Sequence, residues 1–222
     1  MVRKERLVPI RALKRAIETS SMSLWRDLKA LEESGLIKRM HGAIALPDYS
    51  IHGGSEPVFQ HKAAQSAPQK AAIARHVARE LILPGEILCL TSGSTVAAVV
   101  PFLDPGQLTL LTNSLEVMNA AAPMVPSLTL LTSGGMYREL SHTFVGPQAE
   151  AFFQEHTADT LLLGAAGLTL KEGVTDPNPL DTVIKKAMIA SARRVIAVMN
   201  STKLGTRSMT AVMALEDLDI LV

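Results

Sequence analysis

Residues 20–42 read SSMSLWRDLKALEESGLIKRMHG, and this stretch determines the fold of the first part of the chain. Two serines open it, leucines follow at helical spacing and Gly35 ends the pattern, which predicts a capped amphipathic helix. A short extended arm with two basic residues, 36–39, comes next. The outward face of the helix carries a tryptophan, an arginine and a lysine. This face predicts a helix that lies against a negatively charged partner.

The charge of the chain is divided unevenly. Residues 1–46 hold ten Lys and Arg against five Asp and Glu, a net charge of +5, while the remainder holds twelve against sixteen, a net −4, so that the whole chain carries +1. A basic small module joined to a mildly acidic larger one predicts nucleic acid as the partner of one end only. An unevenly charged solvated surface is the alternative interpretation of the charge alone.

Length and composition exclude several classes of protein. The 222 residues are enough for a small module and one domain with its own core, and 47% hydrophobic residues exclude a mostly disordered chain. No apolar run approaches the roughly 18–20 residues that cross a bilayer, and the first residues lack the apolar segment of a secretory signal. The single cysteine, Cys89, can form no internal disulfide, so a reducing cytoplasm is the simplest location.

Residues 1–46 are predicted to form a winged helix-turn-helix DNA-binding domain. Residues 8–17 have apolar side chains on one helical face and Pro9 in the first turn, where a missing N–H removes no helical hydrogen bond. A tight turn separates this short helix from the helix that begins at the serines, and the basic arm follows. In this motif the second helix enters the major groove and the arm lies on the DNA backbone.

The order of residues in this domain resembles that of DeoR-type bacterial repressors. The resemblance is carried by residues 20–28, SSMSLWRDL, and by Leu31-Glu32, Gly35-Leu36, Arg39 and His41-Gly42-Ala43. Groove and phosphate contacts are expected from Ser20, Ser21, Met22, Ser23, Trp25, Arg26, Lys29, Lys38, Arg39 and His41.

Two features depart from this family pattern. Trp25 stands where the family usually has a second basic residue, and it would either pack inward at the junction of helix and arm, the preferred interpretation, or stack on the DNA backbone. The family also begins with a further helix, for which residues 1–7 leave too little chain. We therefore expect the first helix to be missing at the N-terminus, and a final element to be missing after the apolar run at 218–222.

The rest of the chain is predicted to be a linker, residues 47–67, and an α/β effector-sensing domain, residues 68–222. The linker contains glycines and prolines and has no sustained period. After it, apolar runs alternate with helical stretches, which predicts a mainly parallel sheet with helices on both faces. The predicted strands are 86–90, 108–111, 128–131, 160–163, 195–199 and 218–222, and the predicted helices are 68–82, 96–103, 115–122, 148–154 and 183–192.

Small polar residues follow the first three predicted strands. These segments are 91–95 (TSGST), 112–114 (TNS) and 133–135 (SGG). Ligands of open parallel sheets bind beyond the carboxyl ends of the strands, and hydroxyl and backbone N–H groups there favour an anion. Converging on one crevice, the segments would form a phosphate-sized site; plain turn chemistry is the alternative for each segment alone.

The second and third of these segments resemble the effector domain of the same DeoR family, together with FVGP at 144–147, KKAM at 185–188 and STKLG at 201–205. Such domains resemble ribose-5-phosphate isomerase and CoA-transferase folds and bind phosphorylated sugars or related metabolites. The resemblance implies an effector site made of Ser92, Gly93, Ser94, Thr95, Asn113, Ser114, Gly134 and Gly135, with positive charge from Lys185 and Lys203. A solvated charge is the alternative interpretation of each lysine.

Four neutral residues stand where the family commonly has carboxylates, namely Thr91, Ala166, Val183 and Asn200. Isomerisation of a sugar phosphate needs a base to move a proton, usually a positioned carboxylate. Their replacement therefore disfavours enzymatic activity. It also removes acceptors for sugar hydroxyls, so that the ligand is expected to be unusual, or its binding weak or lost.

Other titratable residues indicate no metal, cofactor or catalytic centre. The six histidines have no metal-ligand spacing, and one cysteine cannot make a zinc site. His142 follows Gly135 closely and could touch a ligand, although a surface-loop histidine is the preferred interpretation. Asp176 and Asp181 lie in a proline-rich segment that could cover the crevice, and turn capping is preferred for them.

These observations together predict a cytoplasmic DNA-binding transcriptional regulator, a repressor of a carbohydrate-metabolism operon that responds to a phosphorylated sugar or related metabolite. One such module binds DNA weakly, so a homo-oligomer that reads repeated half-sites is expected. Two alternatives stay open. One is a sugar-phosphate isomerase-like enzyme, and the other is a degenerate regulator whose pocket no longer senses a ligand.

Overall fold

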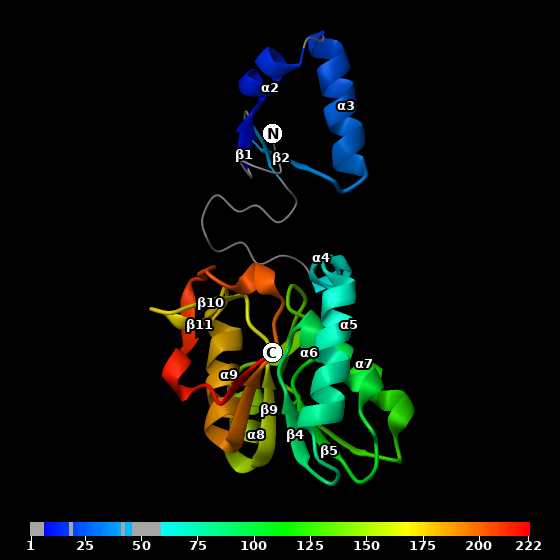
Figure 1. Ribbon diagram of the computed structural model, residues 1–222, viewed down its shortest axis with the longest axis vertical. Coiled ribbons are helices and arrows are strands. Elements are labelled where there is room, and N and C mark those ends of the chain that lie inside the picture. The colour runs from blue at the N-terminus through cyan, green and yellow to red at the C-terminus, as the bar shows by residue number, and fades with distance from the viewer. Residues whose placement is uncertain (1–6, 18–19, 41–42, 46–58) are drawn as a thin grey trace. The chain divides into compact units, whose positions relative to one another are not determined.

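The computed structural model divides the chain into two compact units, Met1–Ser55 and Glu56–Val222 (Figure 1). It describes residues 7–17, 20–40, 43–45 and 59–222. The smaller unit has one hydrophobic core, whereas the larger unit has two, one on each face of its main sheet.

The N-terminal unit combines two helices with a three-stranded antiparallel sheet in the order β1-β3-β2. Its strands are β1 (Leu7–Pro9), β2 (Lys38–Met40) and β3 (Ala43–Ala45), and its helices are α2 (Ile10–Ala16) and α3 (Ser21–Glu33). The core consists of Val8, Leu13, Leu24, Leu28, Ile37 and Ile44. The basic arm expected after the second helix leads into β2, which pairs with β3.

The helix predicted for residues 8–17 begins later than expected. Val8 and Pro9 belong to β1, where Val8 pairs with Ile44 of β3, and α2 starts at Ile10. Val8 and Ile44 are both buried, because β-branched side chains pack well across a pair of strands. Ile17, which was expected on the apolar face of the helix, is exposed.

Helix α3 begins and ends where the sequence predicts. Ser20 is the N-cap, and its Oγ accepts a hydrogen bond of 3.2 Å from the backbone N–H of Ser23. At the other end Gly35 has a φ of +70°, and the N–H of Leu36 donates to the carbonyl oxygen of Leu31 at 2.9 Å. The first two leucines of the helix are buried, but Leu31, expected on the same face, is exposed.

The larger unit is built on a parallel six-stranded sheet in the order β14-β12-β9-β4-β5-β6. The strands are β4 (Ile87–Leu90), β5 (Thr109–Thr112), β6 (Thr129–Thr132), β9 (Ala158–Leu163), β12 (Ala192–Ala197) and β14 (Ile220–Leu221). All six overlap the predicted strands. The predicted fold class, a mainly parallel α/β domain preceded by a small helical module, is confirmed.

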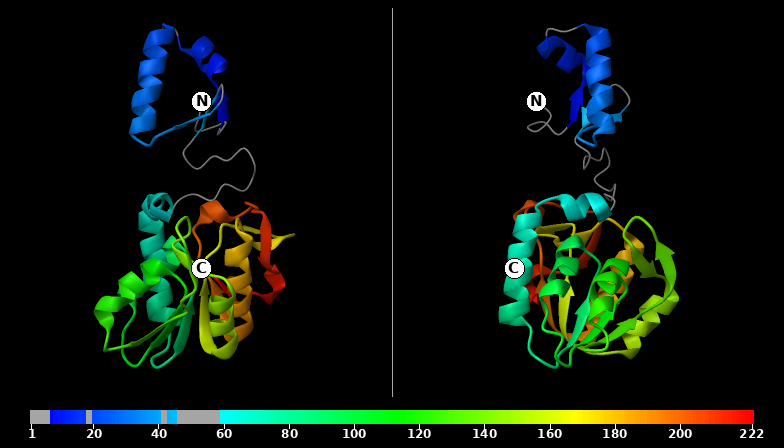
Figure 2. Two further views of the ribbon diagram at one scale, coloured as in Figure 1. Left: turned by 180° about the vertical axis from the view of Figure 1, so that it is seen from behind. Right: turned by 90° about the vertical axis from the view of Figure 1, so that its right-hand side faces the viewer.

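Helices cover both faces of this sheet (Figure 2). One face carries α5 (Ala67–His76), α6 (Ser94–Val99) and α7 (Leu115–Ala121), and the other carries α8 (Pro147–Glu155) and α9 (Pro179–Ser191). Strand β4 shows how the strands serve both cores, because Leu88 and Leu90 lie in the first core and Cys89 in the second. Burial on both faces explains why these strands are continuous apolar runs in the sequence.

Several smaller elements differ from the expectations. The linker predicted for residues 47–67 is wrong in its second half, where helix α4 spans Phe59–Ala64; residues 47–58 lie outside the described residues. A hairpin and a second antiparallel sheet, in the order β10-β11-β13, were also not predicted. Their strands are β7 (Met136–Arg138), β8 (Thr143–Val145), β10 (Gly167–Thr169), β11 (Gly173–Asp176) and β13 (Thr210–Met213). With three or four residues each, they are too short to show a period-2 pattern.

Short helical turns of other kinds continue several elements. A π-helical segment, η1 (Val77–Leu81), prolongs α5, and the 3-10 turns are η2 (Val100–Phe102), η3 (Ala122–Met124), η4 (Ser201–Lys203) and η5 (Leu215–Asp217). Among the helices that the structure describes, none is long and apolar enough to cross a membrane.

Candidate functional site

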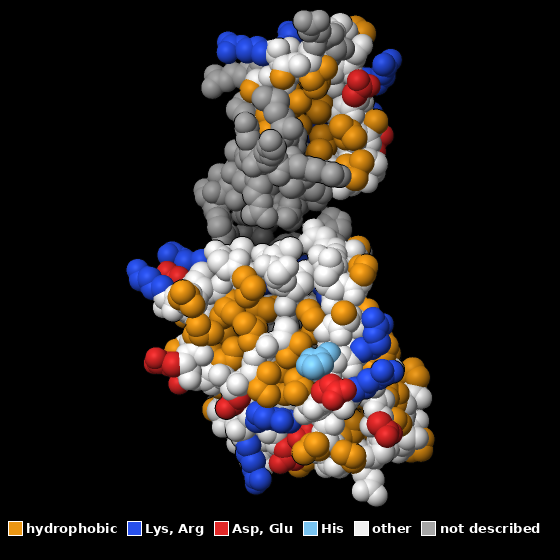
Figure 3. All heavy atoms as spheres, viewed as in Figure 1, with side chains coloured by type: hydrophobic (Ala, Val, Ile, Leu, Met, Phe, Trp, Pro, Cys, Tyr) orange, Lys and Arg blue, Asp and Glu red, His pale blue; other side chains and the backbone are white. Residues whose placement is uncertain are grey.

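The exposed face of α3 carries side chains that were expected to meet DNA. Met22 is exposed, and the side chains of Arg26 and Lys29 are 79% and 69% exposed. Arg26 lies 3.6 Å from Asp27 and Lys29 lies 3.8 Å from Glu33, so both form surface ion pairs of small strength. Figure 3 shows basic side chains (blue) beside acidic ones (red) at this side of the unit. Both cations can exchange these weak partners for phosphate oxygens.

Trp25 and Arg39 connect α3 to β2. The guanidinium group of Arg39 lies over the ring of Trp25, 5.7 Å from its centroid. Arg39 Nε lies 2.5 Å from Oε2 of Glu32, and its backbone N–H donates to Oε1 at 3.2 Å. Trp25 thus contacts the arm through Arg39, but the preferred interpretation that it packs inward is wrong, because 47% of the residue is exposed and it is not part of the core of this unit. Arg39 has a structural partner on each side, and this fixes β2 on the helix.

The other residues predicted to contact DNA are distributed as follows. Ser20 caps the helix and its Oγ donates to Oγ of Ser23 at 3.2 Å. Ser21 lies in α3 and Lys38 in β2, while His41 lies outside the described residues. The contact with DNA stays a prediction for all of them.

The strand order of the larger unit reverses at one point. The chain adds β5 and β6 on one side of β4, and later adds β9, β12 and β14 on the other side. In open parallel sheets a ligand binds at such a topological switch point, beyond the carboxyl ends of the strands. The segments that follow β4 and β9, residues 91–93 and 164–166, are the two on either side of this point.

Glycines allow these two loops to approach each other closely. Gly93 has a φ of +144°, and a Cβ placed on it would lie 3.6 Å from the Cα of Gly164. A Cβ on Gly164 would come within 2.8 Å of the carbonyl oxygen of Ser92. Thr91, one of the four neutral positions, joins the strand ends. Its Oγ1 accepts a hydrogen bond from the N–H of Gly164 at 2.9 Å and donates to the carbonyl oxygen of Leu162 at 3.2 Å.

A cavity of about 90 Å³ lies beyond this point. Six of the ten predicted effector residues line it, namely Ser92, Gly93, Ser94, Thr95, Lys185 and Lys203. The lining residues outside that predicted set are Phe59, Lys62, Gln65, Lys70, Ser141, Gly164, Ala165, Ala166, Asp176, Pro177, Asp181, Val198, Met199, Asn200 and Thr202, of which Ala166 and Asn200 are two of the four neutral positions. They come from α4, α5, the turn between β7 and β8, the end of β11, the start of α9, and the segments after α4, β9, β11 and β12.

Four lysines line the cavity, and two of them are buried. Lys70 and Lys185 are 6% and 5% exposed. Lys70 donates to the carbonyl oxygen of Lys62, and burial together with the positive charge of Lys203 holds the pKa of Lys70 below its usual value. A buried ammonium group beside a second cation favours an anion between them. The cavity therefore has a positively charged end formed by α4, α5 and η4.

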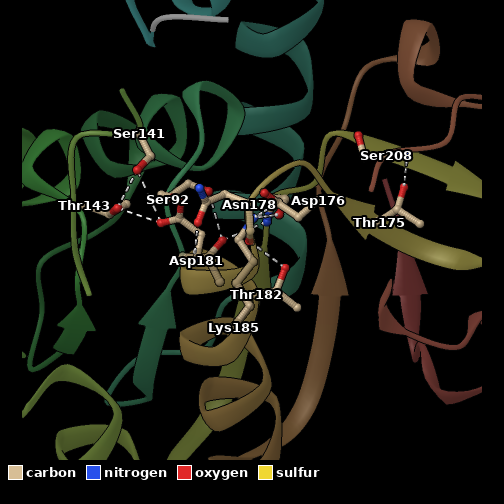
Figure 4. A network of polar contacts seen from close by, with 12 residues as sticks. Ser92, Ser141, Thr143, Thr175, Asp176, Asn178, Asp181, Thr182, Lys185 and Ser208 are labelled. Carbon is tan, nitrogen blue, oxygen red and sulfur yellow. Dashed lines mark hydrogen bonds and ion pairs between the residues drawn. The ribbon is translucent and has the colours of Figure 1, made fainter. Parts of the chain in front are cut away.

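Two carboxylates also line the cavity, and each already contacts a cation (Figure 4). Asp176, at the end of β11, forms an ion pair with Lys185. Lys185 Nζ also donates to the carbonyl oxygen of Gly164 at 2.8 Å. The lysine predicted as a ligand contact is thus neither a solvated charge nor an uncompensated one, because Asp176 balances it.

Asp181, in the first turn of α9, joins this helix to the β7–β8 hairpin. Its carboxylate is buried and accepts hydrogen bonds from Thr143 at 2.7 Å and Ser141 at 3.3 Å (Figure 4). It also accepts a hydrogen bond from Arg138 at 3.1 Å. Turn capping, the preferred interpretation of Asp176 and Asp181, is wrong. The side chain of Asn178 caps α9 instead, since its Oδ1 accepts from two N–H groups of the first turn.

The other four predicted effector residues are not among the residues that line this cavity. They follow β5 and β6, on one side of the switch point, so the expected convergence of all three loops does not extend to them. Asn113 Nδ2 donates to the carbonyl oxygen of Phe144 at 2.9 Å, and Ser114 caps α7. Gly134 and Gly135 have positive φ and lead into β7. Their assignment to the effector site stays a prediction that the cavity does not support.

In the part of the chain that the structure describes, no group of three or more His, Cys, Asp and Glu side chains could hold a metal ion. Cys89 is buried in the sheet, and burial raises the pKa of its thiol well above the usual value. A thiol in this state is a poor nucleophile and a poor metal ligand.

Comparison with known proteins gives matches for both units. Residues 1–49 match the DeoR-like helix-turn-helix domain, and residues 65–222 match the DeoR C terminal sensor domain. The chain is 33% identical over 206 residues to the HTH-type transcriptional regulator GlpR of Haloferax volcanii, and the matched region covers 91% of this chain and 78% of that protein. It is 29% identical over 225 residues to the transcriptional repressor AccR of Agrobacterium fabrum, with 100% and 85% covered. The structure of ribose 5-phosphate isomerase A from Methanocaldococcus jannaschii is similar with a TM-score of 0.45 and 16% identity, over 63% of this chain and 55% of that one.

Proposed function

Because the chain belongs to the DeoR family of transcriptional regulators, we propose that its cavity binds a phosphorylated sugar or a related metabolite and thereby changes its affinity for DNA. The chain is a DNA-binding regulator with a sensor domain, and we assign it the role of a repressor in carbohydrate metabolism. The observation that carries the effector proposal is the positively charged end of the cavity, where Lys62, Lys70 and Lys203 stand beside Ser94.

In this proposal α3 enters the major groove of DNA. Arg26 and Lys29 contact phosphates, which gives affinity without sequence information, and the serines at the start of α3 reach base edges. Exposure of both cations and the weakness of their present ion pairs support this assignment.

The effector is oriented in the cavity by its two ends. Its phosphate group binds at the lysines, and its hydroxyl groups face the carboxylate acceptors of Asp176 and Asp181. These acceptors offset part of the loss at the four neutral positions. Val183, one of those positions, is exposed and is not among the lining residues, so its substitution leaves the cavity unchanged.

The regulator is proposed to act as a homo-oligomer in the cytoplasm. One recognition helix makes few contacts, and two copies related by symmetry would read two half-sites one helical turn or a multiple apart.

An isomerase-like enzyme is the second candidate, and the two carboxylates in the cavity are the observation in its favour. Each carboxylate already accepts hydrogen bonds, Asp176 from Lys185 and Asp181 from Arg138 and two hydroxyls. Neither is therefore placed as a base for substrate, and the DeoR family is not an enzyme class. Turnover of a pentose or hexose phosphate that Asp176→Asn abolishes would favour the enzyme.

A thermal-shift screen against a panel of sugar phosphates tests the effector proposal. A ligand at about one hundred times its dissociation constant stabilises the folded state by roughly 2.7 kcal/mol, which raises the melting temperature. Lys203→Met is expected to weaken binding of the effective ligand by at least about tenfold, since a charge-assisted hydrogen bond contributes roughly 1.5–3 kcal/mol. Lys171→Met, at an exposed lysine outside the cavity, is the matched control and keeps the wild-type shift. A panel with no active member would instead favour a degenerate regulator.

A further inference from the structure

Helix α4 is held in place by groups that line the cavity. The carbonyl oxygen of Lys62 accepts hydrogen bonds from the ammonium group of Lys70 and from Oγ of Ser94, the latter at 3.3 Å. Lys70 belongs to α5 and Ser94 to α6, and both residues line the cavity. Figure 1 shows α4 beside the start of α5, and α4 also packs against α6. One carbonyl group of α4 is thus its polar anchor on the cavity wall.

The acceptor that the structure gives Lys70 is a carbonyl oxygen and not a carboxylate. A carbonyl oxygen carries only a partial charge, so it compensates a buried ammonium group less well than an anion does. The positive charge of Lys203 acts on the same ammonium group. A phosphate group would compensate both lysines at once, and it offers three acceptor oxygens where the Lys62 carbonyl offers one.

We propose that the phosphate group of the effector binds between Lys70 and Lys203, takes the hydrogen bonds of Lys70 and Ser94 from the Lys62 carbonyl oxygen, and so releases α4. This inference rests on the proposed function, because it requires a phosphate monoester in the cavity. Lys70, a residue not predicted as a ligand contact, becomes the group through which the ligand acts.

The opposite end of α4 keeps its contact when the anchor is lost. Phe59 is buried, and its ring stacks on the ring of His142 with a centroid distance of 5.4 Å and an interplanar angle of 19°. His142 Nδ1 is in turn bonded to Glu116. In the proposal, phosphate binds Lys70 and Ser94, and neither of these donors belongs to the Phe59–His142 stack. The release is therefore confined to the Lys62 end, and α4 turns about Phe59.

The position of α4 in the chain gives this release a consequence. It is the first described element that follows β3 in the sequence, so α4 is the described element of the larger unit that is nearest along the chain to the DNA-binding unit. Anchored and released α4 are the two states between which the effector selects, because phosphate competes with one of them and not with the other.

Hydrogen–deuterium exchange on the full chain tests this inference, with inorganic phosphate as the probe and sodium chloride at equal ionic strength as the reference. Phosphate is expected to slow exchange at residues 92–97 and to speed exchange at residues 59–66 about fivefold, the effect of losing roughly 1 kcal/mol of hydrogen bonding. A merely structural α4 would exchange more slowly, or at the same rate, when the cavity is filled.

Variants give an independent reading. In Lys70→Met, the amides of α4 are expected to exchange about fivefold faster without any phosphate, and adding phosphate is expected to cause no further change in their rate. Ser94→Ala, the milder change, is expected to give faster exchange of α4 that phosphate still increases, and it serves if Lys70→Met does not fold. Gln69→Ala, on the exposed side of α5, behaves as wild type.

Three outcomes overturn the inference. Phosphate that protects residues 92–97 but leaves α4 unchanged or slower contradicts the release and leaves the proposed effector site intact. Phosphate that changes the exchange rate of neither segment, while a sugar phosphate still raises the melting temperature, contradicts the Lys70 site and again leaves the proposed function. If no phosphate compound changes hydrogen–deuterium exchange or the melting temperature, both this inference and the proposed function are overturned.

Discussion

Helix α3 and the cavity are both proposed to bind anions, but their cations lie in opposite surroundings. Arg26 and Lys29 of α3 are mostly exposed, whereas Lys70 and Lys185 of the cavity are almost fully buried. Exposed cations interact weakly and are screened by salt, which suits a polyanion that gathers many contacts. Buried cations interact strongly and need a fixed partner, which suits a small anion.

This difference limits what net charge can reveal. The +5 charge of residues 1–46 indicates the surface for DNA, because exposed charges of one sign add up over a small module. The remainder carries −4 and yet contains four lysines around one cavity. A site for a small anion depends on the placement of a few buried charges, and the net charge of a domain does not reveal that placement.

The largest effect is expected from breaking a buried pair in the cavity. Lys185→Met leaves the Asp176 carboxylate buried without its ammonium partner, which is expected to lower the free energy of unfolding of the larger unit by roughly 3–5 kcal/mol. Urea denaturation followed by far-UV circular dichroism measures this loss. The matched control is Lys186→Met, at the exposed neighbour, with an expected change within about 0.5 kcal/mol. Equal stability of the two variants would remove the distinction between buried and exposed cations.

A smaller effect is expected from the helix cap of α3. Ser20→Ala removes the oxygen that accepts from the N–H of Ser23, at an expected cost of about 1 kcal/mol. Trp25 is the one tryptophan of the chain, so its fluorescence during urea unfolding follows the N-terminal unit. Ser20→Asp retains a capping oxygen and is expected to keep the wild-type transition. An unshifted tryptophan transition in Ser20→Ala would show that the cap does not stabilise α3.

The smallest effect is expected for an exposed cation, and it should appear mainly in the salt dependence. Arg26→Ala removes one phosphate contact, so the slope of log affinity for DNA against log salt falls by about 0.9. The loss of affinity between roughly 50 and 200 mM salt then shrinks about threefold. Arg207→Ala, at an exposed arginine of the larger unit, is the control and keeps the wild-type slope. An unchanged slope in Arg26→Ala would remove α3 from the DNA interface.

The DNA-binding unit could be predicted well because its signals are local. The cap at Ser20, the leucine spacing and Gly35 all lie within one helix and its two ends. The six main strands could be predicted for a related reason, since burial on both faces leaves a continuous apolar run. The start of α2 could not, because Val8 joins a strand through its pairing with Ile44, a partner distant in sequence.

The cavity could be predicted only in part because topology assembles it. The cavity lies beyond β4 and β9, where the strand order reverses; β5 also pairs with β4, but the residues that follow β5 and β6 do not line the cavity. The sequence did contain one signal that Asp181 and Lys185 lie on a buried face. Asp181, Ile184, Lys185 and Met188 follow the spacing of one helical face, so a carboxylate and a lysine share the buried face of α9.

The central claim is that the cavity and the DNA-binding helix are coupled. The most direct test measures the affinity of the full chain for a DNA fragment selected by the protein from a random-sequence pool, with and without each sugar phosphate that raises its melting temperature. The proposal predicts a change of at least about fivefold at saturating effector, the low end of typical coupling free energies. The same DNA affinity with and without an effector that demonstrably occupies the cavity would contradict it.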